Sequence, residues 1–342
     1  MINAPSTAGE YTYSAVVNAW VLTAEIDSDP DAETTFTSEL SIISYPQADI
    51  SSFRRVDVIP PMNVESPPKT DPMVVSFAEV ARDTYGVAQK QQRASEDRYQ
   101  VKQIGPFRYF VVFDGHGGPH RMDSRHVGDY CVEHLHEDLF RALENVDLAC
   151  EMVVISSLVQ TFVQFDIKLE ALGLKFGSTC TMILIDDIRE KIYQVNLGDS
   201  RSIIFNENTI VSATVDHEPN SKVEKDRIYA AGGVVINNRI TGMIAVSRSF
   251  GDFDAKITKV SPYDPVNGMM SAIPDVIIIP KSDATHIILT SDAPYDRDQH
   301  SNQDLVNMST SCGSDPQLVA ESMVSAIFPR TSDDTTIVYV RI

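Results

Sequence analysis

Cysteine is scarce in this 342-residue chain: only four are present, and no two of them form a C-x-x-C pair. Structural zinc sites and disulfide frameworks both need clustered or paired cysteines, so the sequence argues against either. Scattered, unpaired cysteines suit a reducing compartment. We therefore expect an intracellular protein that is cytoplasmic, nuclear or both.

Basic residues are also few. The chain has 28 Lys and Arg against 48 Asp and Glu, which gives a formal net charge of -20 and a pI near 4.7. Such a charge opposes unaided binding to nucleic acid or to an anionic membrane surface. Cationic ligands, divalent metal ions included, are favoured instead.

Long apolar runs are missing from the early part of the chain. The most apolar stretch there, residues 15–24, contains Asn18 and is too short to span a bilayer. No basic segment precedes it, the second residue is not the glycine of a myristoylation signal, and the last residues hold no prenylation cysteine. We expect a monomer without membrane insertion.

The chain changes character near residue 72. Residues 1–72 hold eleven acidic and three basic residues and finish in the proline cluster IPPMNVESPPKTDP, residues 59–72. Proline clusters of this kind form extended linkers or lie across a surface. We expect residues 1–72 to be an acidic N-terminal extension that docks on the domain, adds a strand or regulates access, and residues 73–342 to be one domain.

From residue 73 onward, helical and strand patterns follow one another with short gaps. Residues 126–146 and 156–174 have the apolar spacing of amphipathic helices, and shorter helices are expected at 220–233 and 315–328. Apolar strand patterns occupy residues 85–90, 107–114, 178–186, 191–199, 200–206, 275–280, 284–292 and 335–342. Two consecutive helices followed by closely spaced strands do not match the alternation of a parallel sheet. The pattern predicts an α+β fold of antiparallel sheets covered by helix pairs.

The segment FVVFDGHGG, residues 110–118, ends an apolar strand with one acid. Glycines end the strand and allow close backbone approach, so Asp114 points out of the sheet beside Gly115 and His116. An ordinary turn after a strand would use the same residue types. Other acids in the chain decide between the two interpretations.

Several further acids stand where strands end or begin. They are Asp199, Asp292 with Asp296 four residues on, and Asp333 with Asp334 before the last strand. Any one of these acids alone is best explained by a turn. Five or more that converge on one side of a sheet could not all stay ionised without a cation. Oxygen ligands without cysteine indicate Mg²⁺ or Mn²⁺.

Nine segments, taken in order, resemble the PP2C (PPM) family of metal-dependent protein phosphatases over most of residues 80–342. They are RASEDRY (93–99), VVFDGHGG (111–118), GSTC (177–180), VNLGDSRS (195–202), VDHEP (215–219), RIYAAGG (227–233), ITGMIAVSRSFGDFDAK (240–256), SDAPYD (291–296) and SDDTTIVYV (332–340). The resemblance implies a four-layer α-β-β-α sandwich of two antiparallel sheets flanked by antiparallel helices.

The resemblance also implies a binuclear Mg²⁺ or Mn²⁺ site. Asp114 would span both ions, Asp292 and Asp333 would complete one, and Glu96 or Asp97 with the carbonyl of Gly115 would serve the other. Asp199 with Asp296 and Asp292 matches a third, weaker metal position. Two divalent cations lower the pKa of a shared water and supply hydroxide at neutral pH, so no side-chain nucleophile is needed.

Two further roles follow from the resemblance. His116 would be the general acid that protonates the departing serine or threonine oxygen. Arg93 would bind the phosphate through its planar guanidinium, with Arg98 as the alternative. The implied activity is hydrolysis of phosphoserine and phosphothreonine in a phosphoprotein substrate. A pseudophosphatase that acts as a binding module and a hydrolase of small phosphoesters are the alternatives.

Other residues receive structural interpretations. Asp166 and Glu170 lie four apart on the second helix and are expected on a solvated face. Arg248 and Asp252 are expected to fix a turn near the site, and residues 253–274 to form a substrate-adjacent flap. Ala293 stands where the family has glycine, so the backbone after Asp292 is expected to differ. Asp334, in place of an amide, adds a negative charge.

Overall fold

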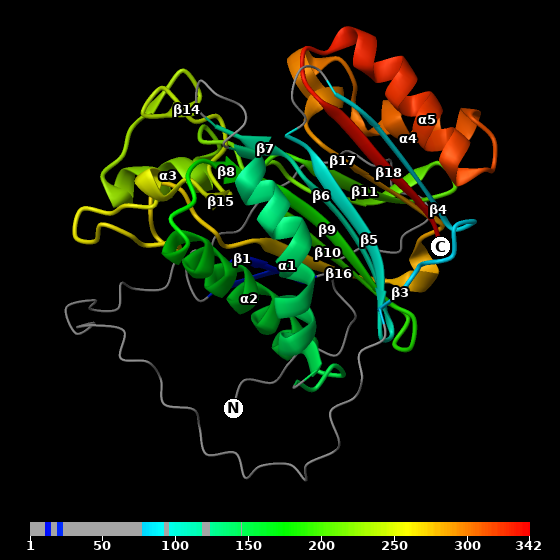
Figure 1. The fold of residues 1–342 in the computed structure, drawn as a ribbon, viewed down its shortest axis with the longest axis horizontal. Helices are drawn as coiled ribbons and strands as arrows, with labels where there is room; N and C mark the ends of the chain where they lie inside the picture. The colour runs from blue at the N-terminus through cyan, green and yellow to red at the C-terminus, as the bar shows by residue number, and fades with distance from the viewer. Residues whose placement is uncertain (1–10, 15–18, 23–76, 92–95, 118–123, 145) are drawn as a thin grey trace, which may run out of the picture. The chain divides into compact units, whose positions relative to one another are not determined.

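The computed structural model describes residues 11–14, 19–22, 77–91, 96–117, 124–144 and 146–342. These residues all belong to one compact unit, formed by residues 1–24 and 76–342. The boundary expected at residue 72 and the proline cluster before it lie outside the described residues. Figure 1 shows the order of the helices and strands.

The larger sheet is antiparallel and, in the described ranges, has eight strands in the order β2-β1-β16-β10-β9-β6-β5-β3. Its strands are β1 (Tyr11–Ser14), β2 (Ala19–Leu22), β3 (Phe77–Ala78), β5 (Arg98–Ile104), β6 (Phe107–Phe113), β9 (Cys180–Asp186), β10 (Lys191–Leu197) and β16 (Asp275–Pro280). The sequence pattern did not predict β5, whose side chains are mostly polar and half-buried. It pairs with β6 through a short turn after Ile104, so its place follows from that of β6.

The smaller sheet is also antiparallel, with five strands in the order β12-β11-β17-β18-β4 among the residues described. Its strands are β4 (Tyr85–Lys90), β11 (Arg201–Asn206), β12 (Thr209–Ala213), β17 (His286–Thr290) and β18 (Thr335–Arg341). Strand β4 pairs with β18, so Tyr85 stands opposite Val340. The two ends of the domain are therefore joined by one strand pair.

Each sheet carries a pair of helices on its outer face (Figure 1). Helices α1 (Ser124–Glu144) and α2 (Glu151–Ala171) pack together against the larger sheet. Helices α4 (Asn302–Ser311) and α5 (Pro316–Ile327) pack together on the smaller one. The predicted α+β sandwich of two antiparallel sheets flanked by helices is confirmed. Short 3-10 turns connect these elements: η2 (Phe253–Ala255), η3 (Lys281–Asp283), η4 (Ala293–Asp298) and η5 (Phe328–Arg330).

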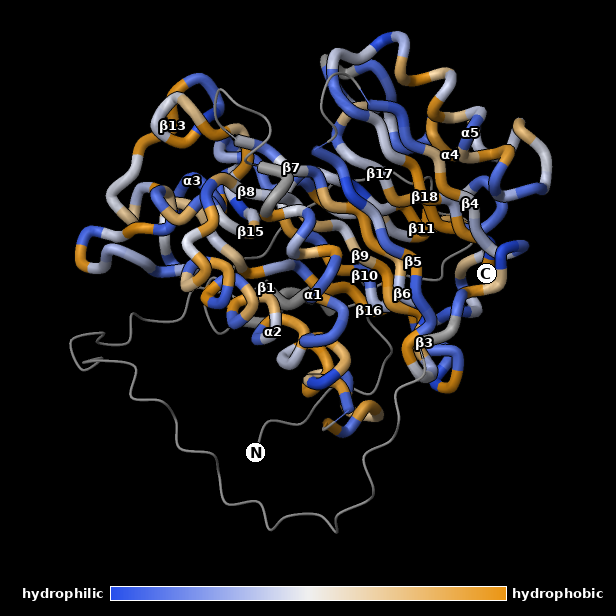
Figure 2. The backbone as a smooth tube through the Cα atoms, viewed as in Figure 1, coloured by the Kyte–Doolittle hydropathy of each residue, from blue (hydrophilic) through white to orange (hydrophobic). Residues whose placement is uncertain are grey.

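The main core lies between the two sheets, where side chains from β6 and β18 meet. Phe110, Val112 and Val338 are fully buried in one apolar cluster there. Tyr109, one residue away, points to the other face and lies against His136 of α1. Strand side chains alternate between faces, so β6 fills two cores at once and is apolar throughout. Figure 2 shows the apolar colour along these strands.

Helix α2 is the one helix among the described residues that is long and apolar enough to cross a membrane. Half of that apolar window is buried against the rest of the chain, as in a core helix. The interpretation of Asp166 on this helix as part of a solvated face is wrong: the side chain is fully buried and pairs with Lys256, which is buried as well. The spacing of charges on a helix does not show which later segment will cover it. Glu170 is exposed, as expected.

A small three-stranded sheet, order β15-β8-β7, lies beside the larger one. Its strands are β7 (Gly115–His116), β8 (Gly177–Ser178) and β15 (Phe250–Gly251). The register places His116 opposite Gly177, and Gly177 opposite Gly251. Helix α3 (Lys222–Ala231) and the hairpin of β13 (Val235–Ile236) and β14 (Arg239–Ile240) form a second, smaller apolar cluster.

Candidate active site

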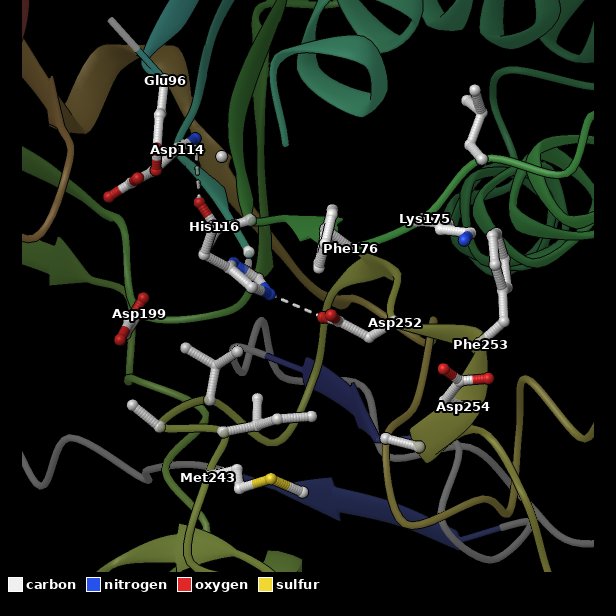
Figure 3. A pocket seen from close by; sticks show the side chains of 18 of the residues that line it. Glu96, Asp114, His116, Lys175, Phe176, Asp199, Met243, Asp252, Phe253 and Asp254 are labelled. Carbon is white, nitrogen blue, oxygen red and sulfur yellow. Dashed lines mark hydrogen bonds and ion pairs between the residues drawn. The ribbon is translucent and has the colours of Figure 1, made fainter. Parts of the chain in front are cut away.

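A cavity of about 1080 Å³ opens where the strand ends carry acids. Five of the carboxylates that line it stand next to strand ends in separate segments: Glu96, Asp114, Asp199, Asp292 and Asp333. His116 also lines it, and Figure 3 shows its ring between Asp114 and Asp252. The predicted convergence of distant strand-end acids is thus seen for these residues.

Asp114 is fixed by the strand next to it. Its backbone N–H donates to Thr179 Oγ1 at 3.2 Å, and the Thr179 N–H donates to the Asp114 carbonyl at 2.8 Å. Thr179 Oγ1 in turn lies 2.7 Å from the hydroxyl of Ser200. The backbone of Asp114 is therefore held on both sides, and its carboxylate stands at the cavity wall.

The acids strongly disfavour one another's charge. Burial raises the pKa of Asp114 and Asp292 well above the ordinary range, and repulsion from neighbouring carboxylates raises both further. Burial, followed by the nearby Asp216, raises the pKa of Asp199 to about 6. Asp292 Oδ1 is buried without a hydrogen-bond partner. Oxygen atoms in this state suit a hard divalent cation, which would neutralise the repulsion and bind that oxygen.

The donor set therefore fits Mg²⁺ or Mn²⁺, although within the described ranges no three such side chains are already closed around one point. The shared repulsion explains this, because neighbouring carboxylates without a cation separate or share a proton.

Two predicted site residues lie elsewhere, and a third is outside the described residues. Asp97 is buried, accepts a 2.6 Å hydrogen bond from Thr336 Oγ1 and is not among the described residues that line the cavity. Asp296, in η4, accepts a bond from Thr331 and is absent from the same lining. Arg93 lies outside the described residues. Its alternative, Arg98, pairs with Asp129 of α1 at 2.5 Å.

Glu96 and Gly115 stand together at the cavity. The Gly115 N–H donates to the Glu96 carbonyl at 3.3 Å, which ties the two segments. The Glu96 N–H donates to Asp334 Oδ2 at 2.8 Å. Asp334 is buried, so the acid that replaces the family's amide accepts a backbone hydrogen bond that an amide oxygen could also accept.

Ala293 does not require the backbone of a glycine. It begins η4 directly after Asp292, whose φ is -71°, and it is not one of the non-glycine residues with positive φ in the described part of the chain. Ala293 is also buried. The substitution of glycine by alanine is therefore compatible with the local helical turn.

This geometry predicts the outcome of Ala293→Gly. Glycine would lose more conformational freedom on folding, so we expect the free energy of unfolding to fall by about 1 kcal/mol. Turnover should be unchanged, as measured with the same substrate under the same metal concentrations. A several-fold gain in turnover would mean that alanine does distort the Asp292 loop.

His116 is paired with an acid that was expected only to fix a turn. His116 Nε2 lies 2.6 Å from Asp252 Oδ2. Burial alone would lower the pKa of His116, but Asp252 raises it overall, and His116 in turn lowers the pKa of Asp252 against the effect of burial. The pair therefore favours an imidazolium beside a carboxylate. Asp252 lines the cavity and is a site residue that the sequence interpretation missed.

Close packing maintains this pair. An added Cβ on Gly177 would lie 2.1 Å from Asp252 Oδ2 and 2.6 Å from His116 Nε2. Only glycine fits at this position of β8. The glycine in the GSTC segment was the available sequence signal, but nothing local indicates which two residues approach it.

The rest of the cavity wall is largely apolar. Phe253 to Ala255 line it, as the expected flap at 253–274 implies, and Met243 to Val246 with Phe176 complete it. Lys175 and Arg239 add positive charge at the same wall. The stretch at 243–246, next to the β14 hairpin, was not part of the predicted flap.

Comparisons with known proteins identify the family to which the chain belongs. The family model described as Protein phosphatase 2C matches residues 86–336. The chain is 32% identical over 235 residues to the mouse "Probable protein phosphatase 1N", covering 66% of this chain and 54% of that protein. It is 34% identical over 203 residues to human "Protein phosphatase 1B" (55% and 40%) and 35% over 178 residues to "Protein phosphatase 2C homolog 2" of Schizosaccharomyces pombe (51% and 44%). The chain spans about half the length of these relatives.

Solved structures share the fold. A C. elegans sex determining protein superposes with a TM-score of 0.62 at 21% identity, covering 77% of this chain and 65% of that one. A phosphatase from Toxoplasma gondii superposes with a TM-score of 0.61 at 20% identity, covering 78% and 95%. Since the family model spans most of the domain that holds the acids and His116, the chain belongs to the protein phosphatase 2C family.

Proposed function

We propose that the protein hydrolyses phosphoserine and phosphothreonine in phosphoprotein substrates, inside the cell and as a monomer. The observation that carries the proposal is the convergence of five carboxylates and His116 on one cavity. Family membership supports the reaction class. The −20 net charge and the scattered cysteines favour a divalent cation and an intracellular setting.

The residues that would hold two Mg²⁺ or Mn²⁺ ions are at the cavity wall. Asp114 would contact both ions, Asp292 and Asp333 one, and Glu96 with the Gly115 carbonyl the other. Asp199, next to Asp292 in the same wall, would hold a third and weaker ion. When bound, such ions supply a hydroxide at neutral pH and polarise the phosphate.

The chain's own side chains would then position the substrate and supply the proton for the leaving group. Asp252 accepts the Nε2 proton of His116, so Nδ1 is the nitrogen left to donate a proton to the departing serine or threonine oxygen. That oxygen is a poor leaving group without a proton. The apolar wall of Phe176, Met243 and Phe253 gives the flanking peptide a surface and excludes water.

The test is steady-state hydrolysis of a phosphothreonine peptide with MnCl₂ or MgCl₂ and with a chelator. We expect turnover with metal and at least a ~100-fold loss with chelator, because the hydroxide needs the ions. Preference for a small phosphomonoester over the peptide would favour the small-phosphoester hydrolase. No turnover by folded, metal-loaded protein would favour the pseudophosphatase.

Thermal unfolding measures metal binding without turnover. We expect MnCl₂ to raise the Tm of the wild type, since a ligand at ~100 times its Kd stabilises the folded state by about 2.7 kcal/mol. The rise should be much smaller for Asp292→Asn, which loses a charged ligand. Asp283→Asn, at an exposed position in η3, is the matched control and should keep the full rise. Equal rises in all three proteins would place the ions elsewhere.

A further inference from the structure

A buried ion pair lies behind the candidate site. Lys256 Nζ and Asp166 Oδ1 are 2.7 Å apart, and both side chains have 0% exposure. Such pairs often stabilise a protein less than apolar residues of the same size would, because both charges lose their hydration. Stability alone is therefore a weak reason for the pair. The groups that the pair contacts indicate a different role for it.

Three of the pair's four other side-chain hydrogen bonds in the described residues go to one turn, Ser249–Gly251. Lys256 Nζ donates to the carbonyls of Ser249 at 2.8 Å and Gly251 at 2.6 Å. Asp166 Oδ1 accepts the Gly251 N–H at 2.8 Å. The pair thus binds the donor and the acceptor of Gly251 together, although Asp166 is on α2, 85 residues away in sequence. It fixes strand β15 against the helix.

The next residue is Asp252, the partner of His116. Gly251 has φ +76° and Asp252 has φ 51°, so the chain makes two successive left-handed steps there. Left-handed backbone is uncommon outside glycine, and although aspartate tolerates it better than most residues, two such steps in succession depend on the contacts around them. The Asp252 N–H donates to the Phe176 carbonyl at 2.8 Å. Ser249 Oγ donates to Asp252 Oδ2 at 2.6 Å.

The turn has little room to move. A Cβ on Gly251 would lie 2.0 Å from the Phe176 carbonyl oxygen, and Gly177 leaves no space between Asp252 and His116. A shift of the turn by a few tenths of an ångström would therefore change the 2.6 Å contact between Asp252 and His116. Phe162 and Phe165 of α2 also pack against Phe250, but among the described residues it is the ion pair that supplies the hydrogen bonds from α2 to this turn.

We infer that Asp166 and Lys256 are positioning residues for the general acid: they fix the Ser249–Gly251 turn and thereby hold Asp252 against His116. This inference rests on the proposed phosphatase function. Tyr263 belongs to the same network, because its hydroxyl donates to Asp166 Oδ2 at 2.9 Å while its ring lies edge-on to Phe253 of the cavity wall.

The test compares two leaving groups. A phosphothreonine peptide releases an alkoxide that needs a proton, whereas p-nitrophenyl phosphate releases an aryl oxide that does not. The variants are Tyr263→Phe, which keeps the ion pair, and the double variant Asp166→Asn/Lys256→Met, which leaves no unpaired buried charge. We expect kcat for the peptide to fall by about 10-fold in the double variant, and less in Tyr263→Phe, with kcat for the aryl ester within about 2-fold of wild type.

Two controls separate positioning from stability. Met323→Ala removes a buried side chain of α5, in an apolar cluster separate from the turn, and should lower both rates equally if it lowers them at all. Lys281→Met removes the ion pairs of a lysine that lies outside the cavity lining and should change neither rate. A double variant that lowers both rates by the same factor would overturn the inference.

A readout without turnover completes the test. In ¹⁵N-histidine NMR, the His116 signals should shift in the double variant and in Asp252→Asn, and stay unchanged in Met323→Ala. Unchanged His116 signals in the double variant would overturn the inference whatever the rates. If the His116 signals shift in the double variant while the wild type hydrolyses neither substrate, the positioning role is upheld and the proposed function is refuted.

Discussion

Asp114→Asn is expected to lower kcat for a phosphothreonine peptide by at least about 1,000-fold, the size of effect seen when a central electrostatic group is removed. Burial first, and then repulsion from Asp97, Asp292, Asp333 and Asp199, raises the pKa of Asp114. In the proposed site, Asp114 is the carboxylate that the two cations would share. An amide has no charge to bridge them.

The Asp114→Asn variant also distinguishes an effect on activity from an effect on folding. It keeps the size of the side chain and both backbone hydrogen bonds to Thr179. Loss of a charge that its neighbours oppose should leave the metal-free protein as stable as wild type or more stable. We therefore expect kcat to fall at saturating MnCl₂ while the Tm measured with chelator does not fall. Asp283→Asn again provides the matched control. Turnover within about tenfold of wild type would exclude Asp114 as a bridging ligand.

Acids at strand ends could be predicted because their signal is local. Asp114, Asp292 and Asp333 each adjoin an apolar strand, and a sheet gathers such ends on one side, so their convergence follows once the strands are assigned. Of the adjacent pair Glu96 and Asp97, sequence favours neither. The structure places Glu96 in the cavity and turns Asp97 toward Thr336; both stand just before β5, where the sequence carries no strand pattern to tell them apart.

Roles that depend on tertiary contacts could not be predicted. Asp252 acquires its role from the register that sets β15 beside β8 and β7, and three two-residue strands leave no periodic signal. Asp166 was expected on a solvated face because it lies four residues from Glu170 on α2, whereas Gly251, which its carboxylate binds, comes 85 residues later. Helix α4 was missed because it is short and polar and begins at a capping box on Ser301 rather than at an apolar repeat.

The largest effect on stability is expected for Glu224→Gln. Glu224 is 3% exposed and lies 2.6 Å from both Arg227 and Arg248, and Arg248 also pairs with Asp275 at 2.9 Å. An amide would leave two buried guanidinium groups with one carboxylate fewer between them. Breaking a buried ion pair from one side costs about 3–5 kcal/mol, so we expect the Tm to fall by roughly 5–10 °C.

The same network of ion pairs contributes to the free energy of unfolding at neutral pH, and this contribution is lost as the pH falls. Burial would raise the pKa of Glu224, but Arg248 and Arg227 hold it well below its ordinary value. Burial would also raise the pKa of Asp275, but Arg248 and His217 lower it to about 2. Both pKa values are lower in the folded state than in the unfolded chain. Their stabilisation is therefore complete above about pH 5 and is lost as the pH falls from there toward 2.

Urea unfolding at pH 7, 5 and 3 measures both effects. Glu224→Gln should start lower than the wild type at pH 7, and the gap between the two proteins should narrow between pH 5 and 3, because one of the two linked carboxylates is gone. The site carboxylates with raised pKa values contribute equally to both proteins and cancel in this difference. Glu321→Gln, an exposed glutamate on α5, is the matched control and should follow the wild type at every pH. If Glu224→Gln lost as much stability on acidification as the wild type, Glu224 would not be a carboxylate whose lowered pKa makes stability depend on pH. Asp275 alone accounts only for its own contribution.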